Sequence, residues 1–431
     1  MSGTEQKNET VVVVGGGLAG LVAAVSLARA GRRVTVFEKA RDAGGRARTQ
    51  VEQGFAWNLG PHALYIGGAA ARTLRALGIP FSGGKPAVSG FVLDRGAKHT
   101  LPGGLVSLLT TRLFGLGDKL ETARLLAGLG RVDAAALAAV RADDWLRSEI
   151  AHEDVRRLLA ALFRLSTYAN SPDQSAEVAV GNLQSALAHG VIYLDHGWQT
   201  LVDGLRDATV ESGARIETGT RVDAVLHDDR VRGVRLAGGR EERCDAIVVA
   251  GAPEDAAALV EGGPLAAWAA AATPVRAACL DVGLSRLPVP GATFGLGVDE
   301  PLYASVHTAV AKLHPSGGAV IHVAKYLPVG TNGDARADER QLEGVLDLLQ
   351  PGWRSVVAAR RFLPQLVVSH ALVTAAGGGL AGRPGPAVPG IAGLFIAGDW
   401  VGCEGLLFDA SAASAAEAAR LVLADSVRAA A

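Results

Sequence analysis

The sequence predicts an α/β fold that begins with a Rossmann-like dinucleotide-binding domain, and three observations carry this prediction. Residues 11–14 are four valines, typical of a buried strand, and they lead directly into a G-x-G-x-x-G turn at residues 15–20. Residues 18–29 have a helical pattern, and a second strand at residues 32–37 ends at Glu38. Strand, turn, helix, strand and acid therefore follow the order of a nucleotide-binding βαβ unit.

Each glycine of the turn has a physical role in such a unit. Gly15 permits the tight turn, Gly17 lets the backbone approach a pyrophosphate, and Gly20 allows the helix to pack closely on the strand. The helix presents the backbone N–H groups of Leu18 and Ala19 to the phosphates. A glycine-rich turn that binds nothing is the alternative, and the ordered context argues against it.

Length and composition predict a globular chain of about two domains. The 431 residues are 49% hydrophobic, which is enough for a large core. The 42 basic and 43 acidic residues nearly cancel, so nucleic acid is not an expected partner.

Cysteine usage and the N-terminal leader bear on the compartment. Cys244, Cys279 and Cys403 are far apart and lack metal-ligand spacing, which indicates a reducing compartment and no metal site. Residues 1–10 lack the basic and apolar regions of a secretory signal, and the valine run is too short to span a bilayer. We therefore expect a cytoplasmic protein.

A second glycine loop follows Glu38. It begins at Lys39 and contains the double glycine Gly44 and Gly45 followed by Arg46. An arginine can offer a fork of donors to a diphosphate, so this loop predicts a second contact on the phosphate side. An exposed basic loop without a ligand is the alternative.

Residues 101–189 are mainly helical in pattern and indicate an insertion. Its opening stretch, residues 101–116, is rich in leucine with few charges. This stretch could form a lid or a peripheral membrane contact, and a buried core helix is the simpler alternative.

The remaining patterns divide the chain into two interleaved domains. Residues 214–217, 221–227 and 231–236 alternate like antiparallel strands, and the buried strand at 245–251 resumes the nucleotide-binding fold. We expect strands at 277–282, 319–327 and 393–397, and helices at 200–211, 339–349 and 407–424. The predicted nucleotide-binding domain comprises residues 1–85, 196–275 and 376–431. The predicted substrate-binding domain comprises a helical insertion, 86–195, and an α+β part, 276–375.

Taken together, these pieces resemble the superfamily of flavin-containing amine oxidases, phytoene desaturases and protoporphyrinogen oxidases, and lie closer to its desaturase-like branch. The resemblance covers nearly the whole chain. It rests on Val-Gly-Gly-Gly-Leu-Ala-Gly at 14–20, Glu38, Gly-Gly-Arg at 44–46 and Ala-Gly-Asp at 397–399, in that order. It implies a glutathione-reductase-type domain that binds FAD non-covalently.

The resemblance also implies roles for individual residues. Glu38 would bind the adenosine ribose, Arg46 the pyrophosphate, and the Gly398-Asp399 pair the pyrophosphate and ribityl chain. Val222 would bind adenine through its backbone. The segment Gly60, Pro61 and His62 would run beside the isoalloxazine ring.

The last helix would aim its N-terminus, at Leu406 and Leu407, at the flavin, where its dipole stabilises the negative charge of the reduced ring. Asp409 in its first turn would complement the dipole of this helix rather than take part in catalysis. Cys403 could suggest covalent flavin, but amine oxidases that attach flavin place that cysteine well before the Gly-Asp stretch. A small packed thiol is therefore the simpler interpretation.

Two departures separate the chain from amine oxidases. Alignment of the ends puts Leu407 where those enzymes place an aromatic residue that cages the substrate nitrogen. Aromatic residues make up only 5% of the chain, whereas cation recognition commonly uses aromatic faces. The lysine expected near the flavin has no convincing match, although Arg276 and Lys325 are nearby.

The expected function is that of an FAD-dependent desaturase or oxidase that removes hydride from an apolar or moderately polar small molecule, with flavin reoxidised by O2 or another acceptor. His62 is the candidate for proton exchange near neutral pH, and a histidine that only shapes the flavin face is the alternative. Strand alternation puts His322 and Tyr326 on one face and Lys325 on the other. An amine oxidase and a non-redox flavoprotein, such as an isomerase or binding protein, remain alternatives.

Overall fold

The core of the first domain is a parallel sheet assembled from distant parts of the chain. The computed structural model describes residues 9–87, 89–331 and 333–430. In the described chain this sheet has the order β10–β2–β1–β14–β20, and every pairing in it is parallel. Its strands are β1 (Thr10–Val14), β2 (Arg33–Phe37), β10 (Arg215–Glu217), β14 (Ala246–Val249) and β20 (Leu394–Ile396).

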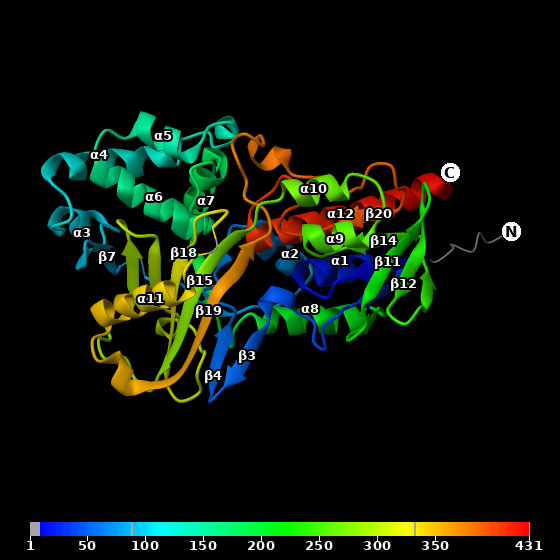
Figure 1. Cartoon of the computed structure of the whole chain (residues 1–431), viewed down its shortest axis with the longest axis horizontal. Coiled ribbons are helices and arrows are strands. Elements are labelled where there is room, and N and C mark those ends of the chain that lie inside the picture. The colour runs from blue at the N-terminus through cyan, green and yellow to red at the C-terminus, as the bar shows by residue number, and fades with distance from the viewer. Residues whose placement is uncertain (1–8, 88, 332, 431) are drawn as a thin grey trace.

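Helices cover one face of this sheet, and a small antiparallel sheet with two short helices covers the other (Figure 1). The first layer contains α1 (Leu18–Arg29), α8 (Gln199–Glu211) and α12 (Leu407–Ala430). The second contains β11 (Val222–His227), β12 (Val231–Leu236), β13 (Glu241–Arg243), α9 (Pro253–Leu259) and α10 (Leu265–Ala271). Both faces of the parallel strands are thus buried, which explains their continuous apolar sequences.

A second, mostly antiparallel sheet forms the other half of the molecule, in the order β19–β15–β18–β17–β16–β7–β8. Helix α11 (Ala335–Leu349) packs on one of its faces, and the opposite face turns toward the first domain (Figure 1). The strands are β7 (Phe91–Asp94), β8 (Ala97–Thr100), β15 (Val275–Leu284), β16 (Phe294–Gly297), β17 (Leu302–Val306), β18 (Ala319–Tyr326) and β19 (Val357–Ser369).

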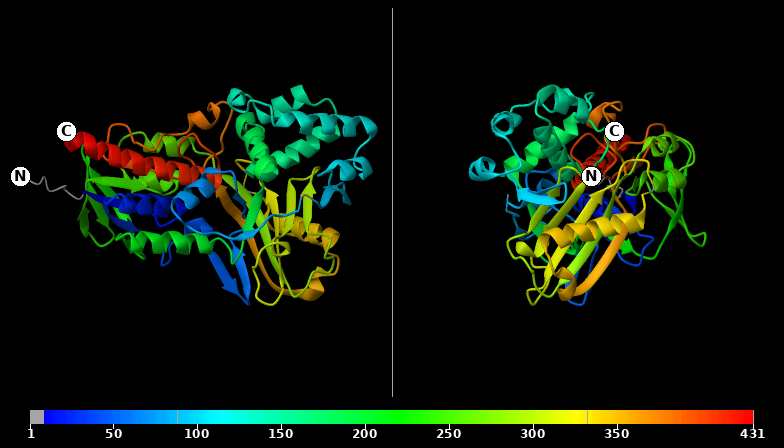
Figure 2. Two further views of the ribbon diagram at one scale, coloured as in Figure 1. Left: turned by 180° about the vertical axis from the view of Figure 1, so that it is seen from behind. Right: turned by 60° about the vertical axis from the view of Figure 1, so that its left-hand side comes forward.

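A group of helices lies over one edge of this second sheet, at the end of the molecule remote from both termini (Figures 1 and 2). These are α3 (Leu105–Thr110), α4 (Leu116–Leu129), α5 (Ala142–Glu149), α6 (Glu153–Thr167) and α7 (Ala176–His189). Smaller elements complete the fold: β3 (Thr49–Glu52), β4 (Phe55–Asn58), β5 (Leu64–Tyr65), α2 (Ala69–Ala76), β6 (Gly83–Gly84), β9 (Val191–Leu194) and the 3-10 turns η1 (Gly45–Ala47), η2 (Ala135–Leu137), η3 (His307–Ala309), η4 (Trp353–Val356) and η5 (Gly379–Gly382).

Most expected elements are confirmed, but one expected pairing is wrong and several strands were not predicted. The helix at residues 18–29 is found with the expected bounds. The strand at 214–217 is wrong in its pairing, because β10 lies parallel to β2 at the edge of the first sheet. Strands β7 and β8 interrupt a segment that was expected to be helical, and the long strand β19 was not expected. Strands β7, β8 and β19 were missed because they are partly exposed and their apolar residues alternate only weakly.

Asp409 joins the last helix to an early one. It lies in the first turn of α12, as expected, but its Oδ1 accepts a hydrogen bond from the backbone N of Ala70 at 2.7 Å. The carboxylate therefore caps the N-terminus of α2 instead of only complementing its own helix. Burial raises the pKa of Asp409 to about 6.

Asp409→Asn is expected to make stability less dependent on pH between about 4 and 7. Because the folded-state pKa is raised, the native protein binds the proton more tightly than the unfolded chain, and stability falls as pH rises through this interval. The rise from 3.8 to about 6 corresponds to a loss of roughly 3 kcal/mol. Urea unfolding at several pH values measures it. The exposed-site control Glu211→Gln should follow the wild type, and parallel curves for Asp409→Asn and wild type would contradict the assignment.

Candidate active site

The first glycine turn has the geometry of a ligand cradle. Gly15 has φ +108°, a conformation that favours glycine. A Cβ on Gly20 would lie 1.9 Å from the carbonyl oxygen of Gly15, so only glycine allows α1 to pack this closely. At Gly17, by contrast, no described atom lies within 4 Å of a built Cβ. The turn is therefore closed on its protein side and open at Gly17.

Glu38 ends β2 as a buried carboxylate bound to backbone. Its Oε2 accepts from the N of Gly16 at 2.6 Å and its Oε1 from the N of Ala40 at 2.7 Å. The backbone N of Thr220 donates to the carbonyl oxygen of Glu38 at 2.9 Å, which brings the start of β11 at Val222 alongside. Three segments expected to bind the adenosine half thus meet at one end of the sheet.

The second glycine loop lies directly against the first. The N of Gly44 donates to the carbonyl oxygen of Gly16 at 2.7 Å, and both Gly44 and Gly45 have positive φ, +119° and +53°. The side chain of Lys39 points elsewhere, to the exposed carboxylate of Asp255 at 3.2 Å. The structure thus places the double glycine beside the cradle. The side chain of Lys39 does not point into it.

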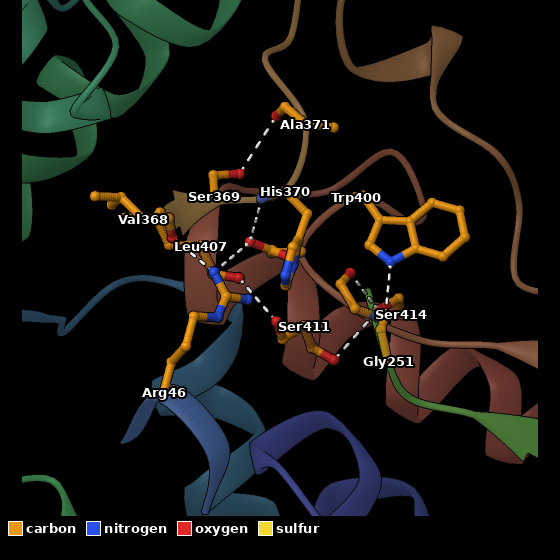
Figure 3. Close-up of polar contacts among 12 residues, drawn as sticks. Arg46, Gly251, Val368, Ser369, His370, Ala371, Trp400, Leu407, Ser411 and Ser414 are labelled. Carbon is orange, nitrogen blue, oxygen red and sulfur yellow. Dashed lines mark hydrogen bonds and ion pairs between the residues drawn. The ribbon is translucent and has the colours of Figure 1, made fainter. Parts of the chain in front are cut away.

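A buried carboxylate, Asp399, links this loop to the second sheet through Arg46 and His370, which Figure 3 shows. Nη1 of Arg46 lies 3.0 Å from its Oδ2 and also donates to the carbonyl oxygen of Val368 at 2.8 Å. His370 contributes its backbone N at 3.1 Å and its Nδ1 at 2.8 Å. Although burial opposes ionisation, Arg46 and His370 hold the pKa of Asp399 well below its usual value.

Gly398, predicted to lie at the pyrophosphate and ribityl chain, is bound to the last helix. Its backbone N donates to Oγ of Ser414 at 3.0 Å, and the same Oγ donates back to the Gly398 carbonyl oxygen (Figure 3). Gly398 therefore fastens the end of β20 to α12, while the neighbouring Asp399 faces Arg46.

His62 lies in a buried environment. Burial lowers its pKa to about 4. Its Nδ1 contacts the carbonyl oxygen of Gly60 at 3.1 Å, and its ring packs 5.0 Å from that of Trp198. The imidazole is thus uncharged at neutral pH and held by backbone, and its part in proton exchange stays a prediction. Gly60, with φ +75°, and Pro61, whose carbonyl oxygen accepts from Tyr168 Oη at 3.1 Å, complete this segment.

All five tyrosines of the chain gather around the inner face of the second sheet. The rings of Tyr168 and Tyr326 meet edge to face at 5.9 Å. Tyr193 Oη lies 3.2 Å from Tyr303 Oη, and Tyr65 Oη donates to the carbonyl oxygen of Ser166 at 3.0 Å. Burial raises the pKa of each phenol, so all remain neutral. The five tyrosines are therefore concentrated on the face of the second sheet that turns toward the first domain.

The start of α12 borders the same region. Leu407 has φ +54°, which is unusual for a side chain of this size, and together with Leu406 it lines a small cavity against β15 and the end of β19. Arg383, which the sequence analysis missed, donates to the carbonyl oxygens of Asp399 and Gly405 and fixes this turn. Cys403 is exposed, so its interpretation as a packed thiol is wrong.

Neither candidate for the family's lysine faces the site. Nζ of Lys325 donates to Asp338 of α11 at 2.8 Å, on the outer face of the sheet. Arg276 alternates along β15 with Ala277, which lies on the inner, tyrosine-bearing face. His322 and Tyr326 share that inner face, as the strand alternation predicted.

Fold and cradle together define a two-domain flavoprotein architecture, and comparison with known proteins gives the family. Residues 18–276 match the model of the family described as flavin containing amine oxidoreductase, and the chain belongs to this family. Members bind FAD, and the residues here fit that cofactor: a glycine turn open only at Gly17, a helix N-terminus without a side-chain cap, and the carboxylate of Glu38.

Two desaturases and two solved structures illustrate the similarity. The chain is 28% identical over 273 residues to a zeta-carotene-forming phytoene desaturase of Myxococcus xanthus, covering 55% of this chain and 52% of that protein. It is 28% identical over 286 residues to hydroxyneurosporene desaturase of Cereibacter sphaeroides, covering 58% and 57%. The chain thus spans little more than half the length of these relatives.

The structural matches extend over nearly the whole chain. An oxidoreductase from Methanosarcina mazei superposes with a TM-score of 0.76 at 18% identity, covering 95% of this chain and 99% of that one. Cyclohexylamine oxidase from Brevibacterium oxydans gives 0.69 at 17%, covering 97% and 99%. At these identities the likeness concerns the fold.

Glu38→Ala is expected to weaken FAD binding at least ~10-fold, because it removes the negative acceptor at the end of β2 and leaves the N–H groups of Gly16 and Ala40 without their partner. Fluorescence titration of the cofactor-free protein with FAD measures the affinity. The exposed-site variant Glu52→Ala serves as control, and unchanged affinity in Glu38→Ala would contradict the placement of the ribose.

Proposed function

We propose that the protein is an FAD-dependent oxidoreductase of the desaturase or oxidase type, which removes hydride from an uncharged, apolar or moderately polar small molecule. The proposal rests on one observation. The cradle at Gly17 and Asp399 is joined through Arg46 to the second sheet, whose inner face carries the tyrosines. FAD, when bound, supplies the electron acceptor for hydride. The chain would hold it through the Gly15 turn, Glu38 and Arg46, and would keep water from the reacting carbon with the buried tyrosines.

Charge distribution favours this proposal over an amine oxidase. The buried carboxylate on the inner face, Asp281, is already paired with Arg361 and His322, so it is not free to receive a substrate ammonium. Leu407 supplies no aromatic wall at the start of α12. An uncharged substrate therefore fits the inner face better than a cation does.

Anaerobic flavin reduction tests the proposed reaction. We expect the purified yellow protein to bleach when an uncharged substrate with a reactive C–H bond is added, and to remain oxidised with primary amines of similar size. Absorbance near the flavin maximum gives the readout. Faster bleaching by the amines would favour the amine oxidase alternative, and no bleaching by either class would favour a non-redox flavoprotein.

We further propose a peripheral membrane contact through α3 and α4. The sequence allowed a buried core helix for this stretch, but only one side of α3 is buried, at Leu108. Among the described residues, six of the nine exposed large apolar side chains lie on these two helices: Leu105, Val106, Leu109, Leu116, Leu120 and Leu126. Leu105, Val106 and Leu116 are more than 70% exposed. Such a concentration is typical of an interaction surface.

The charged residues of this segment favour a lipid membrane as the partner of the apolar surface on α3 and α4. Arg112, Arg124 and Arg131 lie exposed around the apolar side chains. The two acids of the same stretch turn inward: Asp118 lies 3.1 Å from Nδ1 of His152, and Glu121 accepts from backbone N–H groups of residues 151–152. Exposed apolar side chains on a segment that also carries exposed arginines suit anionic lipid headgroups. No helix of the described chain is both long and apolar enough to cross a membrane.

The triple variant Leu105→Ser, Val106→Ser, Leu109→Ser is expected to lower partitioning onto vesicles of phosphatidylcholine and phosphatidylglycerol at least ~10-fold, because each buried leucine or valine contributes about 1.5–3 kcal/mol. Cosedimentation measures it. The control Leu187→Ser, Val210→Ser changes two exposed apolar residues elsewhere and should bind as the wild type does. Equal binding by both variants, or a dimer formed through this face without vesicles, would contradict the proposal.

A cytoplasmic location completes the proposal. It rests on the wide spacing of the three cysteines along the sequence, which indicates a reducing compartment.

A further inference from the structure

Three polar side chains form a buried row across three adjacent strands of the second sheet. Strand β15 pairs Asp281 with His322 on β18 and with Arg361 on β19. Oδ1 of Asp281 lies 2.6 Å from Nδ1 of His322, and Oδ2 accepts from Nη2 of Arg361 at 2.6 Å. Asp281 and His322 have no exposed surface. The redox function proposed above uses none of the three.

The row fixes the hydrogen-bonding state of His322. Although burial opposes ionisation, His322 and Arg361 hold the pKa of Asp281 below its usual value, so it is a carboxylate that can only accept. Nδ1 of His322 must then donate to it, and in the neutral imidazole this leaves the lone pair of Nε2 free to accept. That Nε2 has no hydrogen-bond partner among the described residues. Because buried polar atoms are nearly always paired, it indicates a missing partner.

Two side chains near His322 also have buried polar atoms without a partner among the described residues. The ring of His307 lies 4.4 Å from that of His322 and stacks on Tyr193 at 3.8 Å. Burial holds the pKa of His307 well below its usual value, so it is uncharged. His307 Nε2 and the hydroxyl of Tyr326 are also buried without a partner in the described part of the chain. Unsatisfied polar atoms thus gather on the inner face.

The row packs against the segment expected beside the flavin ring. Arg361 donates to the carbonyl oxygen of Asn58, two residues before Gly60. A Cβ on Gly60 would lie 3.2 Å from Sγ of Cys279, which is on the same side of β15 as Asp281. The polar row therefore borders the place where a reacting carbon would meet the cofactor.

We propose that His322 is a catalytic residue whose Nε2 accepts the proton of a substrate hydroxyl group, and that the substrate is an uncharged alcohol with an apolar body. The inference rests on the proposed function. FAD, when bound, would accept the hydride of the carbinol C–H bond, Nε2 would accept the O–H proton, and the carbinol carbon and oxygen would form a C=O bond. Asp281 and Arg361 are positioning residues, and Asp281 stabilises the resulting imidazolium. The same arrangement disfavours an ammonium group, which would meet Arg361.

A matched panel tests the substrate class with the FAD-loaded protein. It consists of a secondary allylic alcohol, its methyl ether and the parent hydrocarbon, all with one apolar body, and stopped-flow absorbance follows anaerobic flavin reduction. We expect only the alcohol to reduce the flavin. His322→Gln should slow that reduction at least ~100-fold with little change in FAD affinity, because it removes the proton acceptor. His189→Gln, at the exposed end of α7, should react as the wild type does.

A binding measurement separates this role from a purely structural one. A phenol with the same body has the O–H group but no carbinol hydrogen, so it binds without turnover. Its affinity, read from the perturbed flavin spectrum, should fall ~10-fold in His322→Gln, whereas the methyl ether should bind both proteins equally. In ¹⁵N-histidine NMR spectra, Asp281→Asn should shift the His322 nitrogens toward the other tautomer.

The outcomes distinguish the two proposals. If the ether or hydrocarbon reduces the flavin as fast as the alcohol, or if His322→Gln matches the wild type in both assays, the role of His322 is wrong while the redox function stands. If no compound, including an amine, reduces the flavin, both proposals fail.

Discussion

The buried carboxylate of Asp399 is the contact on which the arrangement of the two domains depends. A carboxylate with almost no exposed surface remains ionised only when donors replace its water. Here those donors come from the second glycine loop, through Arg46, and from the end of β19, through His370. Since Arg46 also binds a carbonyl oxygen of β19, one cluster fixes the cofactor cradle against the sheet that faces it. The site geometry follows from this junction.

The inner face of the second sheet has two chemically different parts. Tyr168 and Tyr326 pack with leucines of β19 into an apolar wall, whereas Asp281, His322 and Arg361 provide hydrogen bonds and charge. A hydrocarbon would leave the polar part unsatisfied, and a free cation would meet Arg361. An uncharged molecule with one polar end matches both parts, and such a molecule also partitions into lipid, which agrees with the membrane contact proposed for α3 and α4.

Sequence reasoning recovered the elements that carry local motifs and missed those defined by register. The Gly15 turn, Glu38 and the Ala-Gly-Asp stretch have fixed local spacing, so they could be located without a structure. The row of Asp281, His322 and Arg361 depends on how three strands pair, which no local pattern encodes. A signal did exist for Asp281, since it is a lone acid within an otherwise apolar strand. His370 and Arg383 gave no such signal, because both lie in segments that lack periodicity.

The order of segments along the chain constrains how the protein is made. Strand β20 is the outer neighbour of β14 in the parallel sheet. The segment of chain between these two strands forms most of the second sheet. During synthesis the outer edge of β14 thus remains unpaired until β20 leaves the ribosome. The substrate domain can condense earlier, because most of its strands are neighbours in sequence. A chain that stops before β20 would leave the outer edge of β14 unpaired, and an unpaired strand edge promotes aggregation.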